Sequence, residues 1–255
     1  IYLSKHFEMS FIYNHIKINE EKLKVGVYCP AFYCDPLYIE YNKKVFNHFG
    51  INVNYVTSGS RHGEILNTLS REENVDYLCF VDVDAIPLSP NVLETLIGRI
   101  YNKNAIIGIE QTSNNHSHEA DKLIALSHAI KRGENISKHI SPANNDKNLT
   151  NHEETYAGPA FFLIAKETYK TLGEPSYLET YRSDCGEELS YVAREKGFEV
   201  KYIHFSHCVQ PKWHLKENIK FGIGISYEDL VYHNFQSRAS TSLDMFIEKC
   251  KEVLN

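Results

Sequence analysis

The stretch that decides the fold is Val75-Asp-Tyr-Leu-Cys-Phe-Val-Asp-Val-Asp84, followed by Ala-Ile-Pro-Leu88. Leu78 to Val83 are apolar apart from Asp82, and this density of β-branched and aromatic residues predicts a strand buried on both faces. Such a strand excludes carboxylates unless a cation pairs with them, yet Asp82 and Asp84 stand together at its carboxyl end. Because ligands of open α/β sheets bind at that end of the strands, the two acids predict a divalent metal site that holds a diphosphate.

A purely structural interpretation of the two acids is also open. Asp82 and Asp84 would then cap the turn at Ile86-Pro87, or the helix that starts near Ser89-Pro90. A D-x-D pattern is short and does not by itself decide between capping and metal binding. The surrounding sequence favours the metal site.

From Lys24 onward the chain alternates between strand and helix patterns. Strands are expected over 25–32, 51–57, 75–84, 105–109, 198–205 and 228–235, and in 156–165, where a loop leads into a strand. Helices are expected over 37–49, 63–73, 91–101, 184–197 and 243–253. This alternation predicts βαβ units in an α/β fold, with a Rossmann-like, mostly parallel sheet flanked by helices and a C-terminal helix.

Two segments depart from this pattern. Residues 1–23 are mixed in character and are expected to form a peripheral segment containing a helix. Residues 111–155 are rich in Asn, Ser and His, with a helix expected around 119–132, and are interpreted as an insertion or lid near the site. One domain over residues 24–255 is the simplest organisation.

Charge and composition exclude several classes of protein. The net charge is −6, and no basic run or Lys/Arg stripe interleaved with aromatics indicates a nucleic-acid partner. An anionic ligand in an acidic protein again requires a metal counter-charge. No apolar run approaches the roughly 20 residues that span a bilayer, and the six cysteines, without a C-x-x-C pair, favour a reducing, cytoplasmic compartment. The sequence indicates no oligomeric state.

In this context the D-x-D strand resembles that of the GT-A glycosyltransferases, the nucleotide-sugar-dependent enzymes in which a strand ends in D-x-D. The resemblance runs from about Lys24 to Arg238. It implies a GT-A type fold and a Mn²⁺ or Mg²⁺ ion that Asp82 and Asp84 hold against the diphosphate of a nucleotide sugar. We expect Asp84 to matter more to coordination and Asp82 to be shared between the metal and the donor ribose or sugar. The sugar would pass to a hydroxyl of a glycan or another acceptor.

Two further motifs resemble donor-binding elements of this superfamily. Ser58-Gly-Ser-Arg61-His62-Gly63 resembles the donor-side loop, in which Arg61 would contact phosphate or base with His62 beside it. Tyr156-Ala-Gly158-Pro159 resembles a loop whose glycine lets a sugar lie against the backbone. A polar strand-to-helix loop and a strand-entry turn are the corresponding structural alternatives.

The segment Asp184-Cys-Gly-Glu187-Glu188 resembles the acidic motif that opens the helix under the acceptor. In inverting members a carboxylate there removes the proton of the acceptor hydroxyl, and Asp184 is the first candidate, with Glu187 second. The alternative is an N-cap at Asp184 with Glu187 as its capping-box partner. Both roles can coexist.

GT-A metal sites often take a third ligand from a C-terminal histidine. His233, on a short apolar segment, is the first candidate, and His207 is its rival, with His204 and His214 behind. A neutral imidazole beside carboxylates suits Mn²⁺ and is compatible with Mg²⁺. The histidines of the polar insertion show no ligand spacing and are interpreted as solvated.

Two alternative functions are a sugar-nucleotide pyrophosphorylase and a non-catalytic carbohydrate-binding protein. A sugar-nucleotide pyrophosphorylase would carry a glycine-rich nucleotide loop after its first strand, where this chain has Tyr33-Cys-Asp-Pro36. A non-catalytic carbohydrate-binding protein would keep the fold and lose the metal acids. Asp82 and Asp84 therefore favour the transferase.

Overall fold

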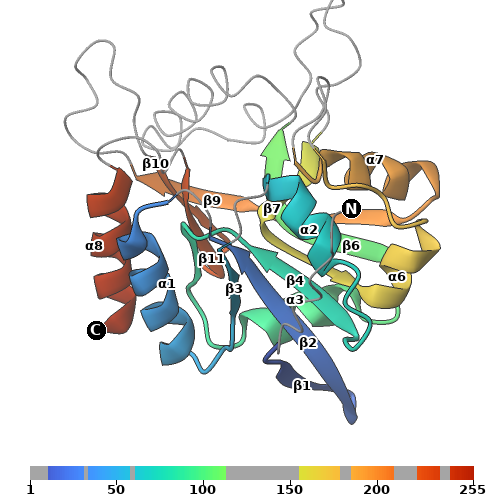
Figure 1. Cartoon of the computed structure of the whole chain (residues 1–255), viewed down its shortest axis with the longest axis horizontal. Coiled ribbons are helices and arrows are strands. Elements are labelled where there is room, and N and C mark those ends of the chain that lie inside the picture. Colours follow the sequence, from blue (N-terminus) through green and yellow to red (C-terminus); the bar gives the residue numbers. More distant parts are fainter. Residues whose placement is uncertain are drawn as a thin grey trace, which may run out of the picture.

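The computed structural model describes residues 11–31, 34–57, 61–112, 155–178, 185–209, 223–235 and 242–255. Within them the chain folds as α/β, with a seven-stranded, mainly parallel sheet flanked by helices (Figure 1). Its strands are β1 (Asn14–Ile18), β2 (Glu21–Pro30), β3 (Asn54–Val56), β4 (Tyr77–Val81), β6 (Ala105–Thr112), β7 (Thr155–Ala165) and β8 (Glu199–Ile203). The helices are α1 (Pro36–His48), α2 (His62–Leu69), α3 (Val92–Ile100), α6 (Lys166–Thr171), α7 (Glu187–Glu195) and α8 (Ser242–Leu254).

The strand order explains why one edge of the sheet is suited to a site. The strands lie in the order β1-β2-β4-β7-β6-β8, with β3 beside β2. β2 is parallel to β3 and β4, and β6 is parallel to β8. Because β7 is antiparallel to both β4 and β6, those two strands run in the same direction. The carboxyl ends of β2, β3, β4, β6 and β8 therefore meet at one edge, as the sequence predicts.

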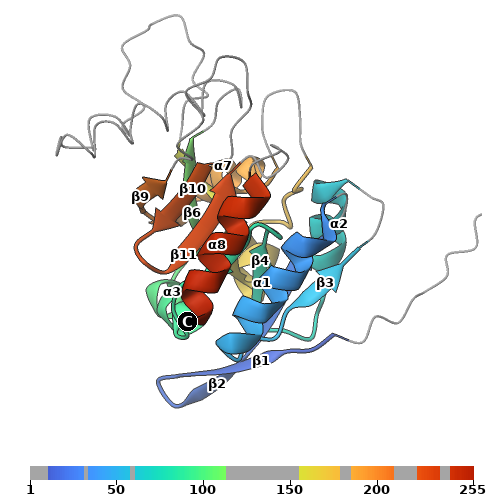
Figure 2. The same cartoon turned by 90° about the vertical axis from the view of Figure 1, so that its left-hand side faces the viewer.

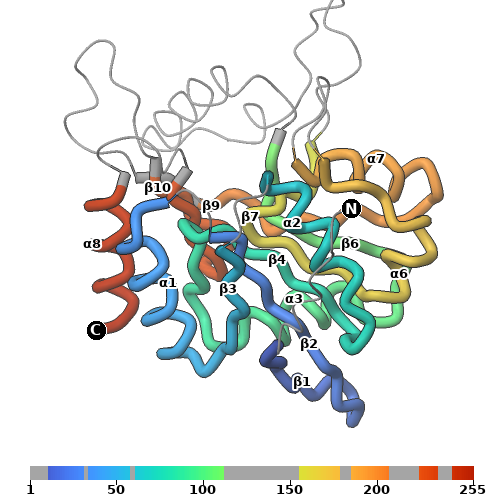
Figure 3. The backbone as a smooth tube through the Cα atoms, viewed as in Figure 1, coloured from blue at the N-terminus to red at the C-terminus, as the bar shows by residue number. Residues whose placement is uncertain are grey.

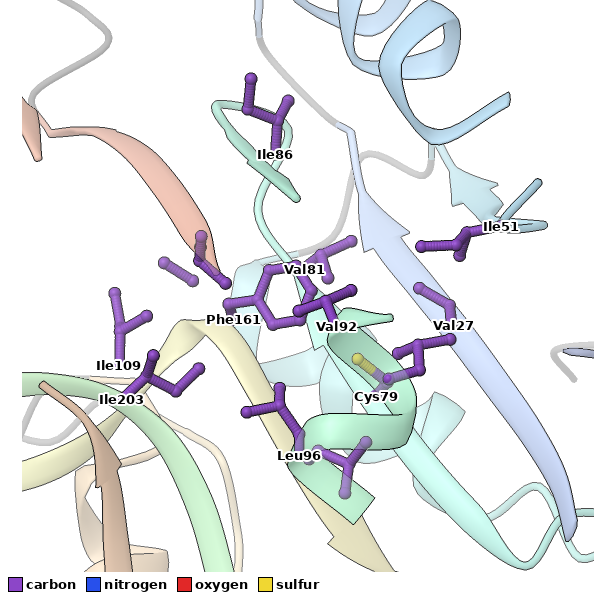
Figure 4. Packing of buried hydrophobic residues seen from close by; sticks show 14 of the residues in the cluster. Val27, Ile51, Cys79, Val81, Ile86, Val92, Leu96, Ile109, Phe161 and Ile203 are labelled. Carbon is purple, nitrogen blue, oxygen red and sulfur yellow. The ribbon is translucent and has the colours of Figure 1, made fainter. Parts of the chain in front are cut away.

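Strand β4 is buried on both faces, which confirms the prediction from its apolar run. Cys79 and Val81 face a core shared with α1, α3 and α8, part of which Figure 4 shows. Leu78 and Phe80 face the opposite core, which contains residues of α2, α6 and α7. The alternation of a strand thus distributes one continuous apolar run between two hydrophobic layers.

A second, antiparallel sheet continues from the first. Its strands are β5 (Ala85–Pro87), β11 (Val231–Phe235), β10 (Ile223–Tyr227) and β9 (Phe205–Val209), paired in that order. Figure 2 shows β10 and β11 beside α8, and the tube in Figure 3 shows α8 alongside α1, although α1 and α8 lie near opposite ends of the chain. β11 and α8 confirm the strand and helix expected in the C-terminal region, while the four-stranded sheet was not predicted.

Two expectations about local structure were wrong. The helix expected within residues 1–23 is absent from the described residues 11–23, while residues 1–10 lie outside the described part. Residues 14–18 form the edge strand β1 instead, because a tight turn at Asn19 and Glu20, both with positive φ (46° and 70°), folds this segment back on β2. Tyr156 to Pro159 belong to β7 rather than to a loop, and the irregularity there is a shift of register between Gly108 and Ile109 of the neighbouring strand.

The start of α7 also differs from its prediction. The helix begins at Glu187 with Gly186 as its N-cap, in the left-handed region at φ 80°. The alternative interpretation, with Asp184 as the N-cap, is therefore wrong, because the helix starts later. Asp184 itself and the helix expected over 119–132 lie outside the described residues. None of the helices in the described part of the chain is long and apolar enough to cross a lipid bilayer.

Candidate metal centre

The two acids occupy the short turn that joins the two sheets. β4 ends at Val81 and β5 begins at Ala85, so Asp82 and Asp84 lie between them. The Asp82 amide donates to the carbonyl of Ala160 at 2.9 Å, and the Ala85 amide donates to the carbonyl of Asp82 at 3.0 Å. These bonds tie the turn to the central sheet and hold its backbone in one conformation.

His233 approaches the turn from the second sheet. It lies opposite Ala85 in the β5–β11 pair, and its Nε2 is 3.7 Å from Oδ1 of Asp84. One ligand atom from each of Asp82, Asp84 and His233 can be chosen so that all three lie within 4.8 Å of one another. Asp84 and His233 are buried, whereas Asp82 is partly exposed. Two carboxylates and an imidazole in this arrangement fit Mn²⁺, and Mg²⁺ is compatible with them.

The field at this turn is negative. Burial raises the pKa of the Cys29 thiol, and the charges of Asp82 and Asp84 raise it further. Burial also raises the pKa of Cys34, with the charge of Asp84 as the next cause. Two thiols at the carboxyl edge thus respond to the acids, which is the electrostatic environment that favours a bound cation.

Helix α2 brings a second histidine to the same turn. His62 is its first residue, and its Nε2 lies 3.3 Å from Oδ1 of Asp82. Arg61 is the N-cap residue, and its backbone N–H donates to the carboxylate of Glu64 at 3.2 Å. The structure therefore places both residues of the predicted donor-side loop at the edge that carries the acids, with His62 in contact with one of them.

Gly158 lies on β7, where the space beside it is occupied. A Cβ at this position would come within 1.8 Å of the side-chain oxygen of Gln111 on β6. The close approach that this glycine permits is thus to Gln111 in the structure. Its role in donor binding stays a prediction.

Helix α7 begins close to the acids. A Cβ on Gly186 would lie 3.5 Å from Pro159, the neighbour of the Ala160 whose carbonyl accepts the Asp82 amide. Glu187 is only 2% exposed and accepts a hydrogen bond from the hydroxyl of Tyr191 at 2.5 Å. The carboxylate of Glu187, the second candidate base, is therefore buried and fixed by a hydrogen bond from Tyr191.

The rival histidines differ in what the structure describes. The backbone of His207 pairs with Ser226 in the second sheet, while its side chain and all of His214 lie outside the described part. Nδ1 of His204 lies 3.2 Å from the carboxylate of Glu110, and His204 does not belong to the group formed by Asp82, Asp84 and His233.

One residue that sequence analysis missed lies directly beneath the turn. Asn42 of α1 is fully buried and donates to the carbonyls of Val83 and Ala85. Asn42 could have been found from its spacing in the sequence, because it lies on the same buried face of α1 as Tyr38 and Val45. A polar residue on such a face requires buried partners.

No family profile and no curated protein matches this chain. Among solved structures it is similar to the mannosyltransferase PcManGT from Pyrobaculum calidifontis, in complex with GDP-Man and Mn²⁺. The two are 13% identical, with a TM-score of 0.41 over 70% of this chain. The match spans 54% of the mannosyltransferase, about half of its length. Because this similarity is distant, any activity has to be inferred from the chain's own residues.

Proposed function

We propose that this protein is a metal-dependent glycosyltransferase of the GT-A type, which moves a sugar from a nucleotide-diphospho-sugar to an acceptor hydroxyl. The observation that carries the proposal is the gathering of Asp82, Asp84 and His233 within 4.8 Å at the carboxyl edge of a mainly parallel sheet. A buried carboxylate, Asp84, beside a second acid and an imidazole favours a bound cation, and a diphosphate is a natural ligand of that cation.

The charges at the site support a diphosphate donor. The chain carries a net charge of −6, and the field at the turn is negative, so an anionic donor would be repelled by the protein alone. Asp82, Asp84 and His233 would hold Mn²⁺ or Mg²⁺, which when bound neutralises the charge that develops on the departing nucleoside diphosphate. Arg61 and His62, at the N-terminal end of α2, would meet the phosphates from the other side.

The acceptor side is assigned to the start of α7. Asp184 is the proposed base that removes the proton of the acceptor hydroxyl, and Glu187 is the second candidate. The position of Gly186 supports this placement, because a Cβ built on it would lie 3.5 Å from Pro159, and the next residue, Ala160, accepts the Asp82 amide. A base in this position gives a product of inverted anomeric configuration.

The proposal includes a reducing, cytoplasmic compartment. Its support is that the five cysteines whose side chains the structure describes carry free thiols. They are Cys29, Cys34, Cys79, Cys185 and Cys250.

The test uses a panel of nucleotide sugars and nucleoside diphosphates, with and without Mn²⁺. We expect one nucleotide series to raise the melting temperature only with the metal, and its sugar to be transferred to an acceptor or, slowly, to water. Formation of a nucleotide sugar from a sugar phosphate and a nucleoside triphosphate would identify a pyrophosphorylase instead. Sugar binding that does not depend on Mn²⁺ would identify a non-catalytic carbohydrate-binding protein.

A further inference from the structure

A buried amide fastens the turn that carries the acids. Nδ2 of Asn42 donates to the carbonyl of Val83 at 3.0 Å and to the carbonyl of Ala85 at 2.8 Å. These two residues flank Asp84. Both N–H groups of the amide are thus used on the backbone, and rotating the amide by 180° would face its oxygen toward two carbonyls.

A residue of the central sheet in turn fixes the side-chain amide of Asn42. The hydroxyl of Tyr55, on β3, donates to Oδ1 of Asn42 at 2.6 Å. The ammonium of Lys43 lies over the Tyr55 ring at 4.7 Å from its centroid. The amide of Asn42 therefore has a single orientation, fixed by the carbonyls of Val83 and Ala85 on one side and by Tyr55 on the other.

Together with β11, Asn42 satisfies three successive carbonyls of the turn. The carbonyls of Val83 and Ala85 accept from Asn42, and that of Asp84 accepts from the backbone amide of Asn234 at 2.9 Å. Each peptide plane around Asp84 is therefore anchored. The direction in which the Asp84 carboxylate leaves the backbone follows from those planes.

We infer that Asn42 is a positioning residue for the metal centre, which holds Asp84 in its ligating orientation toward Asp82 and His233 by clamping the carbonyls of Val83 and Ala85. The inference rests on the proposed metal site. It adds to that site a residue of α1 that touches neither the ion nor the donor. Partners beyond the ligands commonly change metal affinity by about 10- to 100-fold when they are removed.

The experiment measures Mn²⁺ affinity of the nucleotide-free protein, by calorimetry and by the Mn²⁺ electron paramagnetic resonance spectrum, so that no turnover is needed. Asn42→Ala removes both clamping bonds, and Tyr55→Phe removes only the bond that orients the amide. The matched control is Asn14→Ala. Asn14 is also buried and exchanges two side-chain hydrogen bonds with the backbone of Asn52, at 2.9 and 2.8 Å, but lies on the edge strand β1.

We expect Asn42→Ala to weaken Mn²⁺ binding by at least about tenfold and to alter the spectrum of bound Mn²⁺. Tyr55→Phe should weaken it less, and Asn14→Ala should lower the melting temperature while leaving Mn²⁺ affinity within twofold of wild type. Wild-type affinity in folded Asn42→Ala would overturn the inference, as would an equal loss in Asn14→Ala. If Asn42→Ala does not fold, Tyr55→Phe decides, and wild-type affinity and spectrum in that variant would overturn the inference. Absence of Mn²⁺ binding by the wild-type protein is a different result, because it removes the proposed metal site itself.

Discussion

Replacing Asp84 with asparagine separates the role of its charge from the role of its shape. Asp84 is buried, and its carboxylate lies 3.7 Å from the ring of His233. Asparagine has nearly the same volume and keeps one oxygen, so the packing of the turn survives. The negative charge that would attract a metal ion is lost.

Two opposite effects on stability follow from the geometry. Oxygens of Asp82 and Asp84 lie within 4.8 Å of each other, and two negative charges at that separation repel by about 3.5 kcal/mol at an effective dielectric constant of about 20. The metal-free Asp84→Asn protein should therefore be as stable as the metal-free wild type, or more stable.

Mn²⁺ should reverse that order. A ligand at about 100 times its dissociation constant stabilises a protein by roughly 2.7 kcal/mol. For a chain of this size each kcal/mol raises the melting temperature by about 2–4 °C, so Mn²⁺ should raise that of the wild type by roughly 5–11 °C. Asp84→Asn should show almost none of this rise.

The assay is a thermal melt of both proteins over a Mn²⁺ titration. Asp76→Asn is the matched control, because Asp76 precedes the amino end of β4 and accepts the Lys24 amide at 2.6 Å, far along the strand from the turn. It should keep the full rise. A wild-type rise in Asp84→Asn, or its loss in Asp76→Asn, would refute the assignment of Asp84 as a ligand.

Three further predictions use other parts of the chain. His233→Ala should weaken Mn²⁺-dependent nucleotide binding in calorimetry while His207→Ala leaves it largely intact, and the reverse ranking would move the third ligand to β9. Asp184→Asn should lower turnover by about two orders of magnitude or more with donor affinity nearly unchanged, and the wild-type product should be the inverted anomer by NMR; a retained anomer would remove the base from this cluster. Phe80→Ala should lower the free energy of unfolding, measured in urea, by about 3–5 kcal/mol, because Phe80 is fully buried among aromatic rings. The control Leu37→Ala, at an exposed position of α1, should change this free energy little. Equal effects of the two substitutions would contradict the packing described for β4.

The sequence predicted β2, β4 and β6 of the central sheet because each of these strands contains an apolar run. β4 and its acids, the helix α1 and the helix α8 all lie close to their predicted positions. Each carries a local signal, either a continuous apolar strand or apolar residues at helical spacing. These signals can be read from the sequence because the spacing of apolar residues indicates which positions of a strand or helix are buried.

The second sheet escaped prediction because its strands are short and its pairing is non-local. β5 has three residues and β9, β10 and β11 have five each, and β5 pairs with a strand from the far end of the chain. Few residues give a weak alternation, and no local pattern reveals a partner that is distant in sequence. The edge strand β1 was missed for a related reason, because its turn at Asn19 and Glu20 lacks the glycine that usually marks such turns.

The sequence predicted the charged and imidazole side chains of the candidate site, but it did not predict Asn42, the residue that supports them. Aspartates and histidines at strand ends are informative because their charge is costly to bury. Asn42 is an ordinary polar residue until the structure shows that both of its N–H groups are directed at one turn. A role of that kind depends on three-dimensional contacts and leaves only a faint signal in a single sequence.

The three-residue connection between β4 and β5 leaves little room for insertions or deletions at this point of the chain. Only residues 82–84 separate the last residue of β4 from the first residue of β5. Because successive side chains of a strand point to opposite faces, one inserted or deleted residue here would turn the buried Ile86 to the other side of its sheet and shift its pairing with Tyr232. Val83 is itself buried, so another apolar side chain can replace it. We therefore expect this connection to tolerate changes in the identity of its middle residue far better than any change in the number of its residues.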